Sequence, residues 1–169
     1  MSREVYACRA VCQKRASAGR LAARGPSANV RPMEKACYGG GCLCGGVRYE
    51  VGGEVANLCY CHCTSCRRAA GAPLMPWGTF GRESFRLTRG TLAEYRSSPP
   101  VVRGFCAACG TSLTYRHEGH PAELDVALAT LDEPARFAPQ MHVWVSEKLP
   151  WVTISDGLPQ YAAGCVASP

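Results

Sequence analysis

Four cysteines in two short motifs have the spacing of ligands to one metal ion. Cys42 and Cys44 are separated by one residue in "GCLCGG", and Cys106 and Cys109 by two residues in "FCAACGTS". Side chains at positions i and i+2 of an extended segment point to the same side, and a glycine after a C-x-x-C turn tolerates unusual backbone angles. Two such pairs supply the four thiolates of a closed tetrahedral zinc site. We therefore predict a structural zinc here, against the alternative of buried cysteines without a metal.

A second motif, "CYCHCTSC", supplies three more thiolates at Cys61, Cys63 and Cys66. Three protein ligands with an open fourth position are typical of a catalytic zinc, whereas structural sites are closed. Cys59 is the alternative fourth ligand. In a straight strand, however, Cys59 and Cys63 would be about 13 Å apart at roughly 3.3 Å per residue. We expect Cys59 to be a buried or redox-available thiol. The alternative is that Cys59 is a fourth ligand and makes the site a closed, structural one.

Polar residues beside the second motif have two interpretations each. His62 points away from the ligands if the backbone is extended, which favours a surface or supporting position over an acid–base role. Arg67 and Arg68 either offset the negative charge of the site and bind a substrate carboxylate, or lie on a solvated helix face. His117 and His120, in the loop "HEGHP", are expected to be exposed and are not assigned to zinc.

The composition restricts the compartment and the partners. The chain has 169 residues, 12 cysteines and a net charge of +6. No stretch has the apolar length of a membrane helix, and no secretion signal is recognisable, so cysteines at these spacings predict metal ligands before disulfides. Residues 1–32 hold seven of the 19 basic and one of the 13 acidic residues, which accounts for the whole net charge. The remainder is neutral, and nucleic-acid binding by it is not expected.

The first 32 residues and the rest of the chain have different character. Residues 1–32 show no periodicity and are interpreted as a disordered basic extension. A transit peptide, a basic interaction arm, and an upstream start codon with the true start at Met33 remain three explanations for it. Cys8 and Cys12 lie in this extension and are given no metal role. Residues 33–165 are predicted to form a single zinc domain.

Alternating apolar residues predict short strands in an antiparallel arrangement. Val47, Tyr49 and Val51 share one face of a strand, as do Leu124, Val126 and Leu128 of a second strand predicted at 123–131. Further strands are predicted at 84–97, with a glycine turn between two of them, at 112–117 and at 140–147. A short helix is expected at 64–71, ended by a glycine. The segment 150–160 is expected to be tied over the body, with a turn at residues 156–157. Trp77, Trp144 and Trp151 are expected in the core or in a pocket wall.

Five blocks of the sequence resemble, in order, the glutathione-dependent formaldehyde-activating enzyme (GFA) family, which includes the centromere protein V group. They are "GGCLCGGVRYEV", "CYCHCTSCRRAAGAP", "FCAACGTSLTYR", "LDVALATLDEP" and "HVWVSEKLPWVTISDGLPQY". The resemblance covers about residues 38–161 and implies a mostly β, Mss4-like (β-tent) fold with short helical segments. It implies two Zn²⁺ per chain, on the four-cysteine and three-cysteine sets named above. Cys37 and Cys59 are outside the pattern.

The resemblance also implies a cytoplasmic carbon–sulfur lyase. Its reaction would join glutathione and formaldehyde to S-(hydroxymethyl)glutathione, or act on a related thiol and aldehyde. Zinc deprotonates a bound thiol, yet three thiolates already give a zinc site a net charge of −1, which disfavours a fourth. The alternatives are a non-catalytic zinc-binding module for protein or chromatin interaction, and a redox or metal-handling protein.

Overall fold

The computed structural model describes residues 36–164, which are mostly β-structure with one short α-helix. Residues 1–32, including Cys8 and Cys12, lie outside the described residues. The strands are β1 Cys37–Gly41, β2 Arg48–Gly52, β3 Ala56–Cys61, β4 Met75–Gly81, β5 Arg86–Arg89, β6 Ala93–Ser98, β7 Val101–Phe105, β8 Ser112–His117, β9 Glu123–Ala127 and β10 Met141–Val143. The helix is α1 Thr64–Ala70, and single 3₁₀ turns are η2 Arg82–Ser84, η3 Leu128–Thr130, η4 Pro134–Arg136 and η5 Val145–Glu147.

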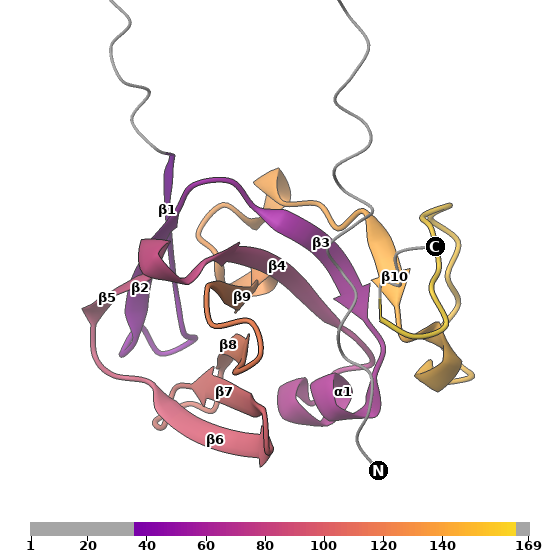
Figure 1. The fold of residues 1–169 in the computed structure, drawn as a ribbon, viewed down its shortest axis with the longest axis horizontal. Helices are drawn as coiled ribbons and strands as arrows, with labels where there is room; N and C mark the ends of the chain where they lie inside the picture. The colour runs from indigo at the N-terminus through magenta and orange to yellow at the C-terminus, as the bar shows by residue number, and fades with distance from the viewer. Residues whose placement is uncertain (1–35, 165–169) are drawn as a thin grey trace, which may run out of the picture.

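The strands form two sheets (Figure 1). A three-stranded antiparallel sheet has the order β1-β2-β5, and a seven-stranded sheet has the order β10-β3-β4-β9-β8-β7-β6. All pairs of the larger sheet are antiparallel except β10 with β3, which is parallel. The predicted mostly β fold with antiparallel sheets and short helical segments is therefore confirmed, with one parallel edge pair added.

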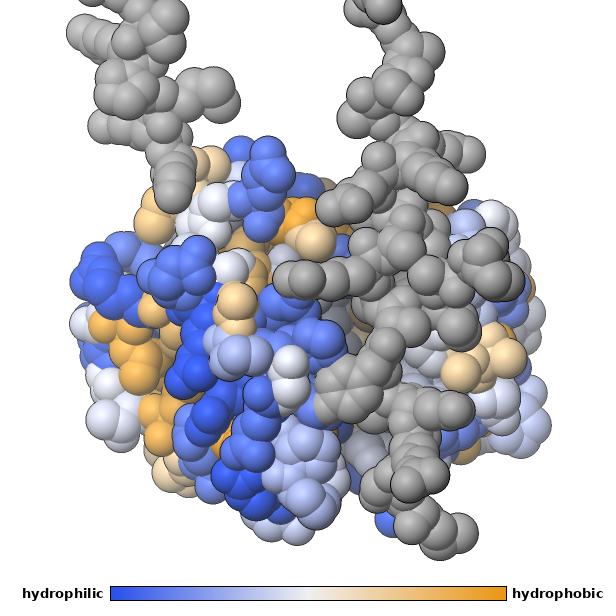
Figure 2. Space-filling view, in the orientation of Figure 1, coloured by the Kyte–Doolittle hydropathy of each residue, from blue (hydrophilic) through white to orange (hydrophobic). Residues whose placement is uncertain are grey.

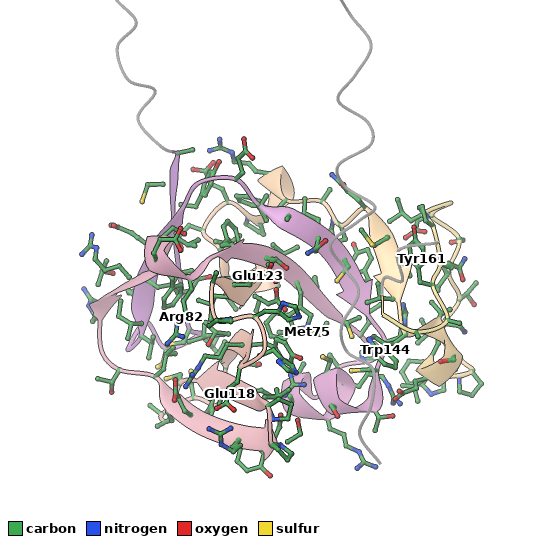
Figure 3. All side chains as sticks on the ribbon, in the orientation of Figure 1. Met75, Arg82, Glu118, Glu123, Trp144 and Tyr161 are labelled. Carbon is green, nitrogen blue, oxygen red and sulfur yellow. The ribbon has the colours of Figure 1, made fainter. Side chains whose placement is uncertain are left out.

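Each face of the seven-stranded sheet covers its own group of buried side chains. One face packs against the three-stranded sheet, where Tyr49 and Val51 meet Phe80, Leu113 and Val126. The opposite face carries a second group beneath α1 and the C-terminal segment. Its buried members are Cys59, Cys61, Cys66, Met75, Trp77, Ala127, Met141 and Val143. Figure 3 shows Trp144 and Tyr161, which pack against this second group, beside β10. The surface toward the viewer in Figure 2 is largely hydrophilic, with smaller apolar areas.

Most of the predicted elements are present, with three differences. Val47, Tyr49 and Val51 are at most 3% exposed, as one-face alternation predicts. The two strands expected at 84–97 exist as β5 and β6, but they lie in different sheets and are not a hairpin. The strand expected at 123–131 ends at Ala127, and the strand expected at 140–147 ends at Val143. A 3₁₀ turn follows each of these strands.

The C-terminal segment is tied to β10 as expected. The amide of His142 donates to the Pro159 carbonyl at 2.8 Å, and the amide of Tyr161 donates to the His142 carbonyl at 2.9 Å. The amide of Trp144 donates to Ala163 in the same way. Within the described residues, the single α-helix spans seven residues and is far too short to cross a bilayer.

Candidate metal centres

The structure brings Cys42, Cys44, Cys106 and Cys109 into one group whose Sγ atoms lie within 4.8 Å of one another. The Sγ atoms of Cys42 and Cys44 are 3.5 Å apart, and those of Cys44 and Cys106 are 3.8 Å apart. Four thiolates around a tetrahedral zinc, with Zn–S bonds of about 2.3 Å, would be about 3.8 Å apart. The group therefore has the donor set and the dimensions of a closed zinc site.

Two loops of matching geometry carry this first group. The amide of Cys42 donates to the Val47 carbonyl, and the amide of Cys106 donates to the Thr111 carbonyl, both at 3.0 Å. Gly45 and Gly110 follow the cysteines with φ angles of +71° and +74°, which glycine adopts without strain. The first loop joins β1 to β2 and the second joins β7 to β8, so the group connects the two sheets.

Hydrogen bonds favour the thiolate form of Cys42 and Cys109 in the first group, whereas the pKa of Cys44 is raised to about 11. The Thr111 hydroxyl, 3.2 Å from the Cys109 Sγ, and the Thr111 amide lower the pKa of Cys109 to about 5. The Val47 amide donates to Cys42 Sγ at 3.2 Å and lowers the pKa of that thiol. Because a metal binds the deprotonated sulfur, these contacts support cation binding.

Cys61, Cys63 and Cys66 form a second group, also within 4.8 Å of one another. Cys61 ends β3, Cys63 is the N-cap of α1, and Cys66 lies inside the helix. The Cys63 Sγ accepts from the amide of Cys66 at 3.3 Å, as an N-cap side chain does. Gly71, in the left-handed conformation at φ 61°, ends the helix as predicted. Cys59 is buried nearby but lies outside the group.

Among the three thiols of the second group, Cys66 is the one whose environment favours ionisation. The thiols of Cys61 and Cys63, followed by the guanidinium of Arg103, lower the pKa of Cys66 to about 2, whereas the pKa of Cys61 is raised. Arg103 points both terminal nitrogens at the Cys66 Sγ, each at 3.7 Å. Three soft donors and no fourth cysteine in this group leave a ligand position for another molecule.

Arg103 was not predicted as part of the site. It comes from β7, on the face of the sheet that α1 covers, and it stacks over the Tyr115 ring with its central carbon 5.1 Å from the ring centroid. Strand pairing continues this polar row from Tyr115 to Asp125 and then to Thr79, whose hydroxyl donates to Asp125 at 2.5 Å. The available sequence signal was an arginine inside the apolar strand "VVRGF".

His62 is fully buried, which corrects the option of a surface position. Its Nε2 lies 2.9 Å from Nδ1 of His142, and Nε2 of His142 lies 2.8 Å from the Asp156 carboxylate. A carboxylate on Nε2 of His142 requires a proton there, so in the neutral ring Nδ1 of His142 accepts from Nε2 of His62. Asp156 thus has two roles. Its carboxylate accepts from the Leu158 amide in the turn, and it also ends the hydrogen-bonded series His62–His142–Asp156.

The other polar residues singled out from the sequence lie away from the second cysteine group or serve local structure. Arg67 donates to the His62 carbonyl and the Thr64 hydroxyl, and Arg68 is exposed on α1. His117 is buried at the end of β8, so the expectation of an exposed histidine there was wrong. Trp151 is 68% exposed and forms no core or pocket wall, in contrast to the buried Trp77.

Three comparisons with known proteins bear on the family of this chain. A curated relative, an uncharacterized lyase of Schizosaccharomyces pombe, is 31% identical over 80 residues, which are 47% of this chain and 58% of that protein. The alignment thus spans little more than half of the relative's length. A crystal structure of a Rhodobacter sphaeroides protein is 25% identical with a TM-score of 0.48, covering 73% of this chain and 98% of that one. The family described as "Glutathione-dependent formaldehyde-activating enzyme" matches residues 37–147, about two thirds of the chain. The chain belongs to the glutathione-dependent formaldehyde-activating enzyme family.

Proposed function

We propose that this protein is a zinc-dependent lyase of the carbon–sulfur class that acts on a thiol and an aldehyde. Glutathione with formaldehyde, giving S-(hydroxymethyl)glutathione, is the pair that the family name supports. The observation that carries the proposal is the second group, in which Cys61, Cys63 and Cys66 offer three thiols to one ion and leave a position for a substrate. A zinc there would keep the sulfur of a substrate thiol deprotonated.

The two cysteine groups have different parts in this proposal. Cys42, Cys44, Cys106 and Cys109 would hold a structural zinc that joins the sheets, because four thiolates leave no place for a substrate. The second group would hold the thiol substrate beside the aldehyde, so that proximity replaces a bimolecular encounter. The nine cysteines of the described residues form no disulfide, which suits the reducing cytoplasm that we include in the proposal.

The decisive experiment measures exchange between free glutathione and its formaldehyde adduct by NMR, with and without protein. Wild type should accelerate the exchange, and Cys63→Ser should abolish the acceleration and remove one of two zinc ions per chain. Cys59→Ala should keep the acceleration and both zinc ions, because Cys59 is outside the group. If X-ray absorption finds four protein sulfurs around the second zinc, and Cys59→Ala removes one, the site is closed. In that case the protein is a zinc-binding module without this activity.

A further inference from the structure

We propose that Arg103 makes the three-cysteine site selective for an anionic fourth ligand, by neutralising the charge that the three thiolates give to the metal. The proposal rests on the proposed function insofar as that ligand is a thiolate. Arg103 lies on β7, 37 positions after Cys66 and remote in sequence from the three cysteines of the second group.

The burial of Arg103 shows that it compensates an anion. Arg103 is only 7% exposed, and a guanidinium stays charged at every pH that proteins tolerate. A buried charge is costly unless it is paired. The described hydrogen bonds of Arg103 go to the Ser97 hydroxyl at 3.2 Å and to the Cys66 sulfur, and neither belongs to a carboxylate. The ionisable group in direct contact with the guanidinium is therefore the Cys66 sulfur. The buried Asp125 carboxyl, separated from Arg103 by Tyr115 along the strand pairing, interacts with it only through space.

This pairing changes the charge balance of the site. Zn²⁺ with three thiolates carries a net charge of −1, so a fourth thiolate would bring it to −2. With the guanidinium of Arg103 alongside, the same step begins from a neutral assembly. Since charges interact strongly where water is excluded, the arginine favours an anionic ligand and leaves a neutral one largely unaffected.

The position of Arg103 is fixed by its neighbours. The guanidinium lies over the Tyr115 ring, and its Nε is held by Ser97. The basic residues next to the cysteines do not share this position. Arg67 is committed to the His62 carbonyl and the Thr64 hydroxyl, while Arg68 points to solvent from α1. The charge compensation therefore belongs to Arg103 and not to the "CRR" motif.

The test compares Arg103→Met, Arg103→Lys and Arg68→Met with wild type in the full chain, refilled with Co²⁺. Absorption difference spectra follow the addition of glutathione, of the small thiol 2-mercaptoethanol, and of imidazole as a neutral ligand. Arg103→Met should bind both thiols about 10- to 100-fold more weakly, the loss expected for hydrogen bonds to a charged group. Its imidazole affinity should remain within about threefold of wild type, and Arg103→Lys should recover most of the thiol affinity.

Arg68→Met is the matched control, because it removes the same charge from an exposed position two residues from Cys66. It should behave like wild type. Equal thiol affinity in wild type and Arg103→Met, or an equal loss of thiol and imidazole binding, overturns the proposal while the proposed function stands. Suppose that wild type binds 2-mercaptoethanol, that this binding depends on Arg103, and that wild type does not bind glutathione. In that case the inference holds and the glutathione assignment falls. Binding of neither thiol nor imidazole by wild type would mean a closed site and would overturn both.

Discussion

At the residue scale, Cys66 is the point at which the cysteine loop meets the large sheet. Its sulfur is contacted by Arg103 from β7, and Trp77 from β4 belongs to the same buried group. The spacing of Cys61, Cys63 and Cys66 predicted this group, because a C-x-C-x-x-C segment needs only a strand end and one helical turn to converge. Arg103 could not be assigned to it from sequence, since strand pairing alone brings it there.

His62 illustrates the same limit. Alternation placed it on the other side of the chain from the cysteines, and that side was expected to face solvent or a supporting group. The partner that buries it, His142, is 80 residues away on the parallel strand β10. No local pattern predicts such a pairing, because parallel strands have no turn between them.

Asp125 gives a prediction about stability and pH. Burial raises the pKa of its carboxyl from 3.8 to about 6, against the opposing hydrogen bond from Thr79. A raised folded-state pKa means that folding favours the protonated form, so ionisation lowers stability as pH rises from 4 through 6. Asp125→Asn keeps an acceptor for Thr79 and removes the charge. It should raise the unfolding free energy by about 1–3 kcal/mol above pH 6 and by little near pH 4.

Urea unfolding of zinc-saturated protein between pH 4 and pH 8 measures this effect. The exposed Glu54 supplies a control, because Glu54→Gln removes a carboxylate that is already in water. A gain for Asp125→Asn that is the same at both ends of the pH range would contradict the assignment, since it could not come from ionisation.

At the element scale, strands with a visible alternation were predicted, whereas β7, which is buried on both faces, was not. β2, β8 and β9 present one apolar face, so their period of two is visible in the sequence. In β7, Val101, Val102, Arg103 and Gly104 are all buried, and β3 contributes Leu58 to one core and Cys59 to the other. Such strands lose their alternation.

The two cysteine groups should respond differently to substitution. Structural zinc contributes roughly 10–16 kcal/mol in small peptides, as much as the whole stability of a typical domain, about 5–15 kcal/mol. Cys42→Ser and Cys109→Ser should therefore give insoluble or unfolded protein. Cys63→Ser should remain folded, because the first group still joins the sheets and serine is a good N-cap for α1.

Circular dichroism and zinc content measure these outcomes, and a chelator titration of wild type adds the order of release. The second metal should leave first, because only three protein thiols hold it. Soluble, cooperatively folded Cys42→Ser and Cys109→Ser proteins with unchanged zinc would refute the four-cysteine site.

The C-terminal segment should depend on the bond between Asp156 and His142. That contact lowers the pKa of the Asp156 carboxyl and holds the segment against β10. Asp156→Ala should accelerate hydrogen exchange of the Tyr161 and Trp144 amides, whose acceptors tie the segment to the sheet. Exchange at the Cys42 and Cys106 amides should not change.

Asp132→Ala is the comparison for this variant, because it also removes an exposed carboxylate with one side-chain partner, Arg48. Its effect should be confined to β1 and β2. Faster exchange over the whole chain in Asp156→Ala would point to a global loss of stability and not to a released segment.

At the scale of the whole molecule, the first cysteine group is a link between two sheets that pack on one core. One loop of each sheet carries a cysteine pair, and the amide of Leu43 reaches the Thr111 hydroxyl across the junction at 3.1 Å. The sequence predicted which cysteines would meet. It did not predict that β5 and β6 separate into different sheets, because a strand–glycine–strand pattern is the same for a hairpin and for a crossing between sheets.

The last prediction concerns the part of the chain that forms this assembly. All ten described strands and both cysteine groups lie within residues 36–164, whereas the net charge resides in residues 1–32. A chain starting at Met33 should therefore match the full chain in zinc content and differ by less than about 0.5 kcal/mol in unfolding free energy. A chain starting at Gly41 loses most of β1 and its pairing with β2, and should be clearly less stable. Thermal unfolding of the three chains at equal zinc distinguishes the outcomes. A marked loss already at the Met33 start would show that the basic extension contributes to the stability of the domain.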